Sequence, residues 1–63
     1  MKMLIDQLKD STYLGDAVYA TFDGYQIWLH TSNGIEVTNS IALEPAVYDA
    51  LVRYVHKAYS KQL

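Results

Sequence analysis

The sequence contains no cysteine, and its 63 residues include a single proline and only three glycines. Without cysteine, neither a disulfide framework nor a thiolate metal site can stabilise the fold. The chain also has no apolar run as long as a membrane span, and its N-terminal apolar patch lacks the h-region of a signal peptide. We therefore expect a cytoplasmic protein with no membrane association.

The chain also lacks a large excess of charge of either sign. It has five Lys and Arg residues and seven Asp and Glu residues, which gives a net charge of −2. A general nucleic-acid binder needs clustered cations to displace counterions from the phosphates, and this chain has no such cluster. The charge is also too small for an acidic mimic of nucleic acid. General nucleic-acid binding is therefore not expected.

Apolar and aromatic side chains, in contrast, are abundant. They make up 51% of the chain, which includes six Tyr, one Trp and one Phe. A chain of this length forms one small domain, residues 1–63, near the lower limit for a single core. Because a monomer of this size has too little interior for so many apolar side chains, we expect a homo-oligomer.

The strongest local signal is Asp23-Gly24, which lies between residues that alternate in polarity. Such a pair is typical of a two-residue type I′ turn, in which both central residues have positive φ. The predicted hairpin would have one apolar face and one face that is aromatic and polar, and any function of the sheet is expected on the second face. On the apolar face, the register places these pairs opposite each other: Phe22–Tyr25, Ala20–Ile27 and Val18–Leu29. On the aromatic and polar face, it pairs Thr21–Gln26, Tyr19–Trp28 and Ala17–His30.

A second turn is predicted at residues 32–34. A two-residue loop would move Val37 to the polar face. A three-residue loop with Gly34 in the left-handed region pairs Val37 with Leu29 and keeps one face apolar. We therefore predict the three-residue loop, followed by a third strand at about residues 35–41.

The segment from Pro45 to about Ser60 is predicted to be helical, with Pro45 at the first helical position. At about 100° per residue, its polar side chains occupy an arc of roughly 100° and its apolar side chains an arc of roughly 200°. A helix on one sheet needs an apolar stripe only about half as wide. The excess predicts a second partner for the helix.

Residues 1–10 have apolar side chains at helical spacing but form too short a segment for a stable isolated helix. The fold class is therefore predicted as α+β: a three-stranded antiparallel β-meander with a C-terminal α-helix packed on one face and a short N-terminal helical or extended segment.

Five residues are candidates for ligand or partner contacts. Tyr19 and Trp28 fit three roles: a structural cross-strand pair, an oligomer interface, or a platform for bases or partner side chains. Gln26 and His30 would supply hydrogen bonds, although a solvated His30 at the strand end is an alternative. Arg53 would meet an anionic group, although a lone Arg on a polar helix face is usually just solvated.

Catalytic and metal-binding signatures are missing. The two histidines lie on different predicted elements without metal-ligand spacing, and the glycines are isolated turn residues rather than a phosphate loop. Asp16 and Asp23 are explained by their turns. We expect no enzymatic activity, no cofactor and no bound metal.

The run YLGDAVYATFDGYQIWLHTSNG, followed by IALEPAVYDALVRY, resembles a group of short proteins encoded by bacteriophages and prophages. The resemblance covers roughly Tyr13 to Tyr54, and glycine often stands in that group where this chain has Ala17. It implies a phage accessory protein in the host bacterial cytoplasm that counters a host defence, with sequestration of its nucleotide signal as the specific form of this hypothesis. The alternatives are a protein–protein inhibitor of a host defence or regulatory protein, and a phage structural or regulatory component.

Overall fold

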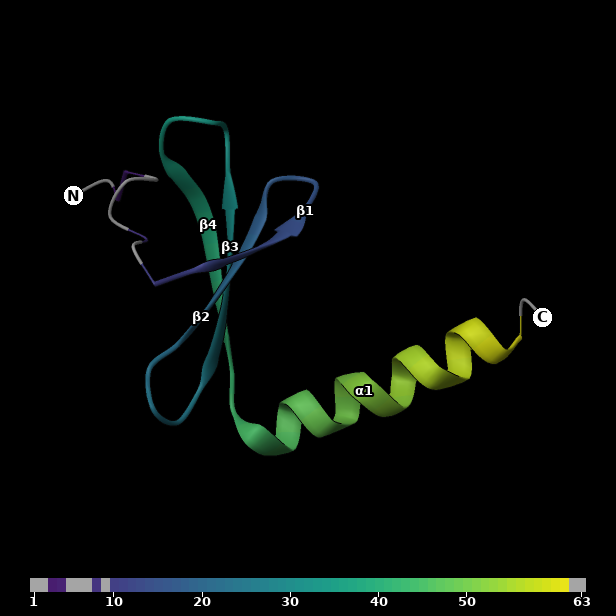
Figure 1. Ribbon diagram of the computed structural model, residues 1–63. Coiled ribbons are helices and arrows are strands. Elements are labelled where there is room, and N and C mark those ends of the chain that lie inside the picture. The colour runs from purple at the N-terminus through teal and green to yellow at the C-terminus, as the bar shows by residue number, and fades with distance from the viewer. Residues whose placement is uncertain (1–2, 5–7, 9, 62–63) are drawn as a thin grey trace.

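The computed structural model describes residues 3–4, 8 and 10–61 of the chain. These residues form a β-sheet followed by a helix (Figure 1). In chain order the elements are β1 (Thr12–Gly15), β2 (Val18–Phe22), β3 (Ile27–Ser32), β4 (Val37–Leu43) and α1 (Pro45–Ser60).

The α+β class is confirmed, but among the described residues the antiparallel meander has four strands, in the order β1-β2-β3-β4, not three. The additional strand is β1, which was not among the predicted strands. Its residues pair with β2, with Thr12 opposite Ala20. The chain reverses instead at Asp16 and Ala17, whose φ values of 50° and 64° are both positive. Positive φ at both residues is typical of a type I′ turn, and the absence of glycine at these two positions concealed it.

The predicted two-residue register of the central hairpin is wrong. Phe22 lies opposite Ile27, so residues 23–26 form a longer connection. The Asp23 side chain explains the difference, because its Oδ1 accepts the backbone N–H groups of Tyr25 at 2.9 Å and Gln26 at 2.7 Å. These bonds draw residues 25 and 26 into the turn. The register moves by an even number of residues, so each side chain keeps its predicted face.

The predicted register of the third hairpin is also wrong. Leu29 lies opposite Ile41 rather than Val37, which pairs with Ser32 beyond a β-bulge. Asn33 acts here as Asp23 does in the central hairpin, because its Oδ1 accepts the backbone N–H groups of Ile35 and Glu36, both at 3.0 Å. The strand therefore begins two residues later than predicted.

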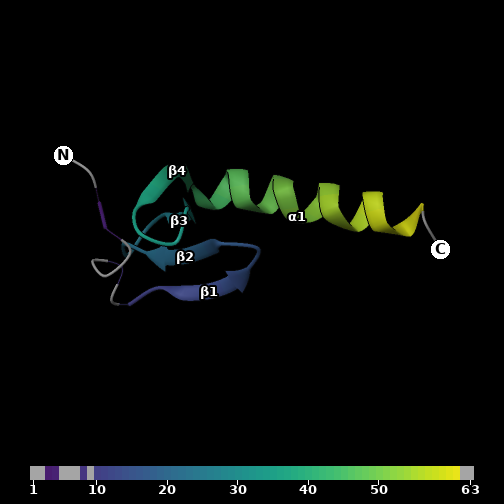
Figure 2. The same ribbon diagram turned by 90° about the horizontal axis from the view of Figure 1, so that it is seen from above.

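Helix α1 has the predicted bounds, but its predicted packing on the sheet is wrong. The helix points away from the sheet (Figures 1 and 2), and none of its residues is buried. A single residue, Glu44, connects β4 to Pro45, and it is extended with φ −68° and ψ 160°. The αR region is unfavourable for a residue that precedes proline. Because the connection is both this short and restricted in conformation, it cannot turn α1 back onto its own sheet.

The described part of the N-terminal segment runs beside the third hairpin. Leu4 forms an antiparallel bridge with Glu36, and the backbone N–H of Val37 donates to the Met3 carbonyl at 2.7 Å. Strand-like pairing therefore occurs at Leu4. The rest of the predicted N-terminal helical or extended segment at residues 1–2, 5–7 and 9 lies outside the described residues.

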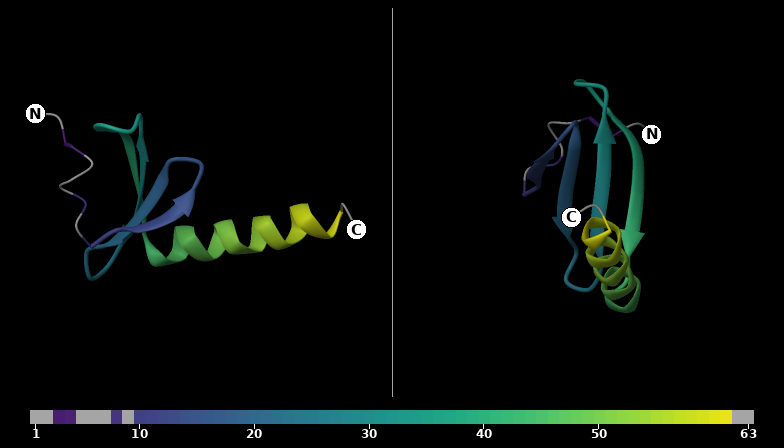
Figure 3. Two further views of the ribbon diagram at one scale, coloured as in Figure 1. Left: turned by 45° about the horizontal axis from the view of Figure 1, so that its top comes forward. Right: turned by 90° about the vertical axis from the view of Figure 1, so that its right-hand side faces the viewer.

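The sheet separates the N-terminal segment from α1, which rises from its opposite side (Figures 1 and 3). No apolar side chain among the described residues is buried, and His30, at 5% exposure, is the one residue in the buried class. We call the side under the N-terminal segment the pocket face; it carries Thr21, Trp28, His30 and Ser40. The opposite side is the apolar face, with Val18, Ala20, Ile27, Leu29, Ile41 and Leu43. Phe22, at the end of β2, lines the cavity described below.

Candidate functional site

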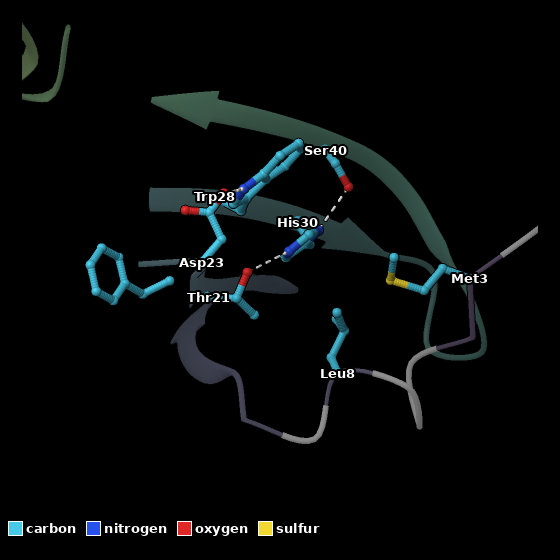
Figure 4. Close-up of a pocket in the computed structure, with 8 residues that line it drawn as sticks. Met3, Leu8, Thr21, Asp23, Trp28, His30 and Ser40 are labelled. Carbon is cyan, nitrogen blue, oxygen red and sulfur yellow. Dashed lines mark hydrogen bonds between the residues drawn. The ribbon is translucent and has the colours of Figure 1, made fainter. Parts of the chain in front are cut away.

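A cavity of about 320 Å³ lies between the pocket face and the N-terminal segment (Figure 4). In Figure 4 the side chains of Met3 and Leu8 lie on the side of the N-terminal segment, near His30, and Trp28 and Asp23 lie farther along the sheet. The strands therefore supply polar and aromatic groups, and the N-terminal segment supplies apolar ones. The lining residues are Met3, Leu8, Thr21, Phe22, Asp23, Trp28, His30 and Ser40.

His30 is fixed by hydrogen bonds to both neighbouring strands. Its Nε2 lies 3.0 Å from Thr21 Oγ1 on β2, and its Nδ1 lies 2.7 Å from Ser40 Oγ on β4. A hydroxyl can donate or accept, so the two partners can satisfy either tautomer of the ring. The alternative of a solvated His30 at the strand end is wrong, because the residue is 5% exposed and its ring is bonded to both neighbouring strands. Sequence reasoning did not predict the register that brings Ser40 to the ring.

Trp28 is oriented by a carboxylate that sequence reasoning had assigned only to the turn. The indole N–H of Trp28 donates to Asp23 Oδ2 at 2.8 Å. This bond is the largest cause that lowers the pKa of Asp23, and the backbone N–H groups of Gln26 and Tyr25 lower it further. Asp23 is therefore held as a carboxylate at the rim of the cavity. The sequence signal was an acidic turn residue close to the only tryptophan of the chain.

The Trp28 and His30 rings are nearly parallel, with an angle of 6° between their planes and 6.2 Å between their centroids. They are two residues apart on β3, so both project from the same face. With Asp23, Thr21 and Ser40 holding the ring nitrogens, both rings have a set orientation before any ligand arrives. Parallel rings in a cavity offer stacking surfaces for another flat ring.

Tyr19 is not part of this cavity lining. It lies opposite His30 in the register, so the predicted Tyr19–Trp28 pair is wrong. The Tyr19 ring instead packs against Tyr13 of β1, with 5.0 Å between centroids and 56° between planes. Because the sequence-based interpretation did not include β1, it could not supply Tyr13 as the partner.

Two other predicted contact residues also lie away from the lining. Gln26 belongs to the turn, where its backbone N–H donates to Asp23. Arg53 lies on α1, which projects from the opposite side of the sheet (Figure 3). Within one chain the structure therefore brings together Trp28 and His30 of the five candidate residues.

The chemistry of the cavity follows from its lining. Among the described lining residues Asp23 is the one acidic side chain and none is Lys or Arg, so this part of the lining carries negative charge. In the same part of the chain, no three His, Cys, Asp or Glu side chains are grouped so that they could hold a metal ion. The arrangement suits a flat, uncharged group with N–H donors, held by stacking and hydrogen bonds.

Comparison of the chain with protein-family models, curated proteins and solved structures finds no match. Over the residues that the structure describes, no helix has both the length and the apolar character needed to cross a bilayer. The cavity geometry is therefore the starting point for a functional proposal.

Proposed function

We propose that this chain is a non-enzymatic binding protein whose cavity takes the flat heteroaromatic group of a small ligand, such as the base of a nucleotide. The observation that carries the proposal is the pair of parallel Trp28 and His30 rings in a cavity. Stacking of bases on aromatic side chains is a common basis of such binding.

The size of the cavity supports a ligand with one ring system inside it. Pockets for small molecules span about 300–1,000 Å³, and this cavity, at about 320 Å³, lies at the lower end. One base fits this range, while the remainder of a nucleotide would extend beyond the lining residues. Met3 and Leu8 would cover the base on the side of the N-terminal segment.

The hydrogen-bonding capacity of Asp23 supports a base with an exocyclic amino group. Its Oδ1 accepts two backbone N–H groups and its Oδ2 accepts the Trp28 indole. An ionised carboxylate has about four lone-pair sites, so Oδ2 retains one for a ligand donor. The same negative charge disfavours a phosphate beside it. The base would therefore enter the cavity and the phosphates would remain outside.

The wider part of the proposal rests on the resemblance of Tyr13 to Tyr54 to short phage proteins. Under this proposal the protein acts in the host bacterial cytoplasm and counters a defence by sequestering its nucleotide signal. His30 fits a binding role rather than a catalytic one, because both its ring nitrogens already have hydroxyl partners.

The test is a titration followed by the fluorescence of Trp28, the only tryptophan of the chain. The panel would hold nucleosides, linear mononucleotides and cyclic nucleotides, so that base and phosphate contributions separate. We expect quenching at micromolar ligand, with a nucleoside retaining most of the affinity of its nucleotide.

Calorimetry on variants provides the control. Trp28→Ala should lose about 1–3 kcal/mol of binding free energy, and Trp28→Phe should lose part of it. The melting temperature of each variant is measured separately, because both also lose the indole N–H bond to Asp23. Tyr25→Phe is the matched control, because Tyr25 is exposed in the same turn and does not line the cavity. Flat titrations with all members of the panel would contradict the proposal and favour the protein–protein inhibitor.

A further inference from the structure

No residue in the described part of the chain covers the apolar face of the sheet. Ile41 is 58% exposed, and the other side chains of this face are also outside the buried class. In an antiparallel sheet with one apolar face, that face normally packs against another layer. Here the described residues of the N-terminal segment lie on the other side of the sheet (Figures 1 and 3), so none of them supplies this layer.

The apolar arc of α1 is uncovered in the same way. Its aromatic and aliphatic side chains are exposed along the whole helix, except for the half-buried Val52 and Ala58. The helix cannot turn back onto its own apolar face, because Glu44 alone connects β4 to Pro45. The exposed residues of the arc include Val47, Tyr48, Leu51, Tyr54, Val55 and Tyr59.

The excess surface area of the chain is close to the area that one partner would bury in an interface. A compact monomer of this mass exposes about 4,100 Å², whereas this chain exposes 5191 Å². The excess of roughly 1,000 Å² is close to the 800 Å² or so that each partner buries in a standard interface. The radius of gyration, 13.5 Å, likewise exceeds the roughly 11 Å of a compact chain of this length.

The two uncovered surfaces also match in length. The 16 residues of α1 span about 24 Å at 1.5 Å per residue. The seven residues of β4 also span about 24 Å at 3.4 Å per residue. A helix of this length covers the apolar face from one end of its longest strand to the other.

We propose that α1 of one copy packs its apolar arc on the apolar face of a second copy of this chain. The polar arc with Asp49, Arg53 and Lys57 then remains in solvent. Because the two copies contribute different patches, the contact closes either as a reciprocal pair or as a ring. This assembly leaves the cavity on the pocket face open, and it does not depend on the proposed ligand.

The test uses one charge on each surface and measures mass by sedimentation velocity and native mass spectrometry. The unmodified chain should assemble, whereas Ile41→Lys on the apolar face and Leu51→Glu on the helix should each weaken assembly about 100-fold or more. Ser60→Glu, on the polar arc, is the matched control and should assemble normally.

Mixing the two variants separates this contact from every other mode of assembly. The Ile41→Lys copy keeps an intact helix, and the Leu51→Glu copy keeps an intact apolar face. An equimolar mixture should therefore form a pair that neither variant forms alone. If helices packed only on helices, Ile41→Lys would still assemble alone; if sheets packed only on sheets, Leu51→Glu would do so. Either result overturns the proposal.

A measurement without variants covers the case in which they do not fold. In a mixed sample with isotope-labelled and unlabelled chains, filtered nuclear Overhauser effects report only contacts between copies. Contacts from Val47, Leu51 or Val55 of one copy to Ile27, Leu29 or Ile41 of another would support the proposal. A monomer at all concentrations, or contacts between helices alone, would overturn it and leave the apolar face to a different protein.

Discussion

Replacing Ala17 by glycine should stabilise the protein. Ala17 has φ 64° in the turn between β1 and β2, and a non-glycine residue in the left-handed region costs roughly 1–2 kcal/mol. Glycine removes this cost but loses about 0.5–1 kcal/mol more backbone entropy on folding than alanine does. The expected net gain is about 0.5–1 kcal/mol, which corresponds to a rise in melting temperature of roughly 2–8 °C.

The same substitution at Ala20 is the matched control, because Ala20 lies within β2, where it pairs with Leu29. Glycine in a strand interior is destabilising by roughly 0.5–1 kcal/mol, so the two variants should move the melting temperature in opposite directions. Calorimetry at one fixed protein concentration would measure both, since association changes the apparent stability. A destabilised Ala17→Gly variant would refute the left-handed conformation and with it the type I′ turn that makes β1 the fourth strand.

Two more predictions concern the pocket face. Thr21→Val should lower the free energy of unfolding, measured in urea, by about 1–3 kcal/mol, because it leaves Nε2 of the buried His30 without its partner. The control Thr38→Val breaks an exposed bond to Thr31 and should lower it less. Equal losses in the two variants would contradict the role of His30. The pKa of Asp23 is held below its ordinary value of 3.8, mainly by the Trp28 indole, so its carboxylate should stabilise the fold above that pH. This stabilisation should be lost as the pH falls through the lowered folded pKa. The fluorescence emission of Trp28 should change as Asp23 is protonated. Asp23→Asn should abolish this pH-dependent change, and the control Asp49→Asn should retain it.

The helix shows how far local sequence signals reach. Its bounds follow from Pro45 and from the absence of glycine up to Ser60, both of which act within one element. The position of the helix relative to the sheet does not follow from these signals. It depends on the single-residue connection at Glu44 and on which surface covers the apolar arc. The width of that arc did predict that one sheet would not suffice as a partner.

The registers show a second limit. Asp23 and Asn33 fit a short turn by residue type, but their side chains accept N–H groups two and three residues ahead and lengthen both connections. Each central pairing moved by an even number of residues, so Trp28 and His30 stayed on one face, as predicted. The hydroxyls that hold His30 were not predictable, because they depend on the pairing of β3 with two neighbouring strands.

The junction at Glu44 makes α1 a lever arm on the sheet. Ser40, which holds His30 from β4, lies four residues before Glu44, and no flexible loop separates that strand from the helix. A tilt of about 10° at the end of β4 would carry the far end of a helix about 24 Å long through roughly 4 Å. A small rearrangement beside the cavity is thereby magnified where α1 ends, and the mechanical link between the two sides of the sheet runs through one residue.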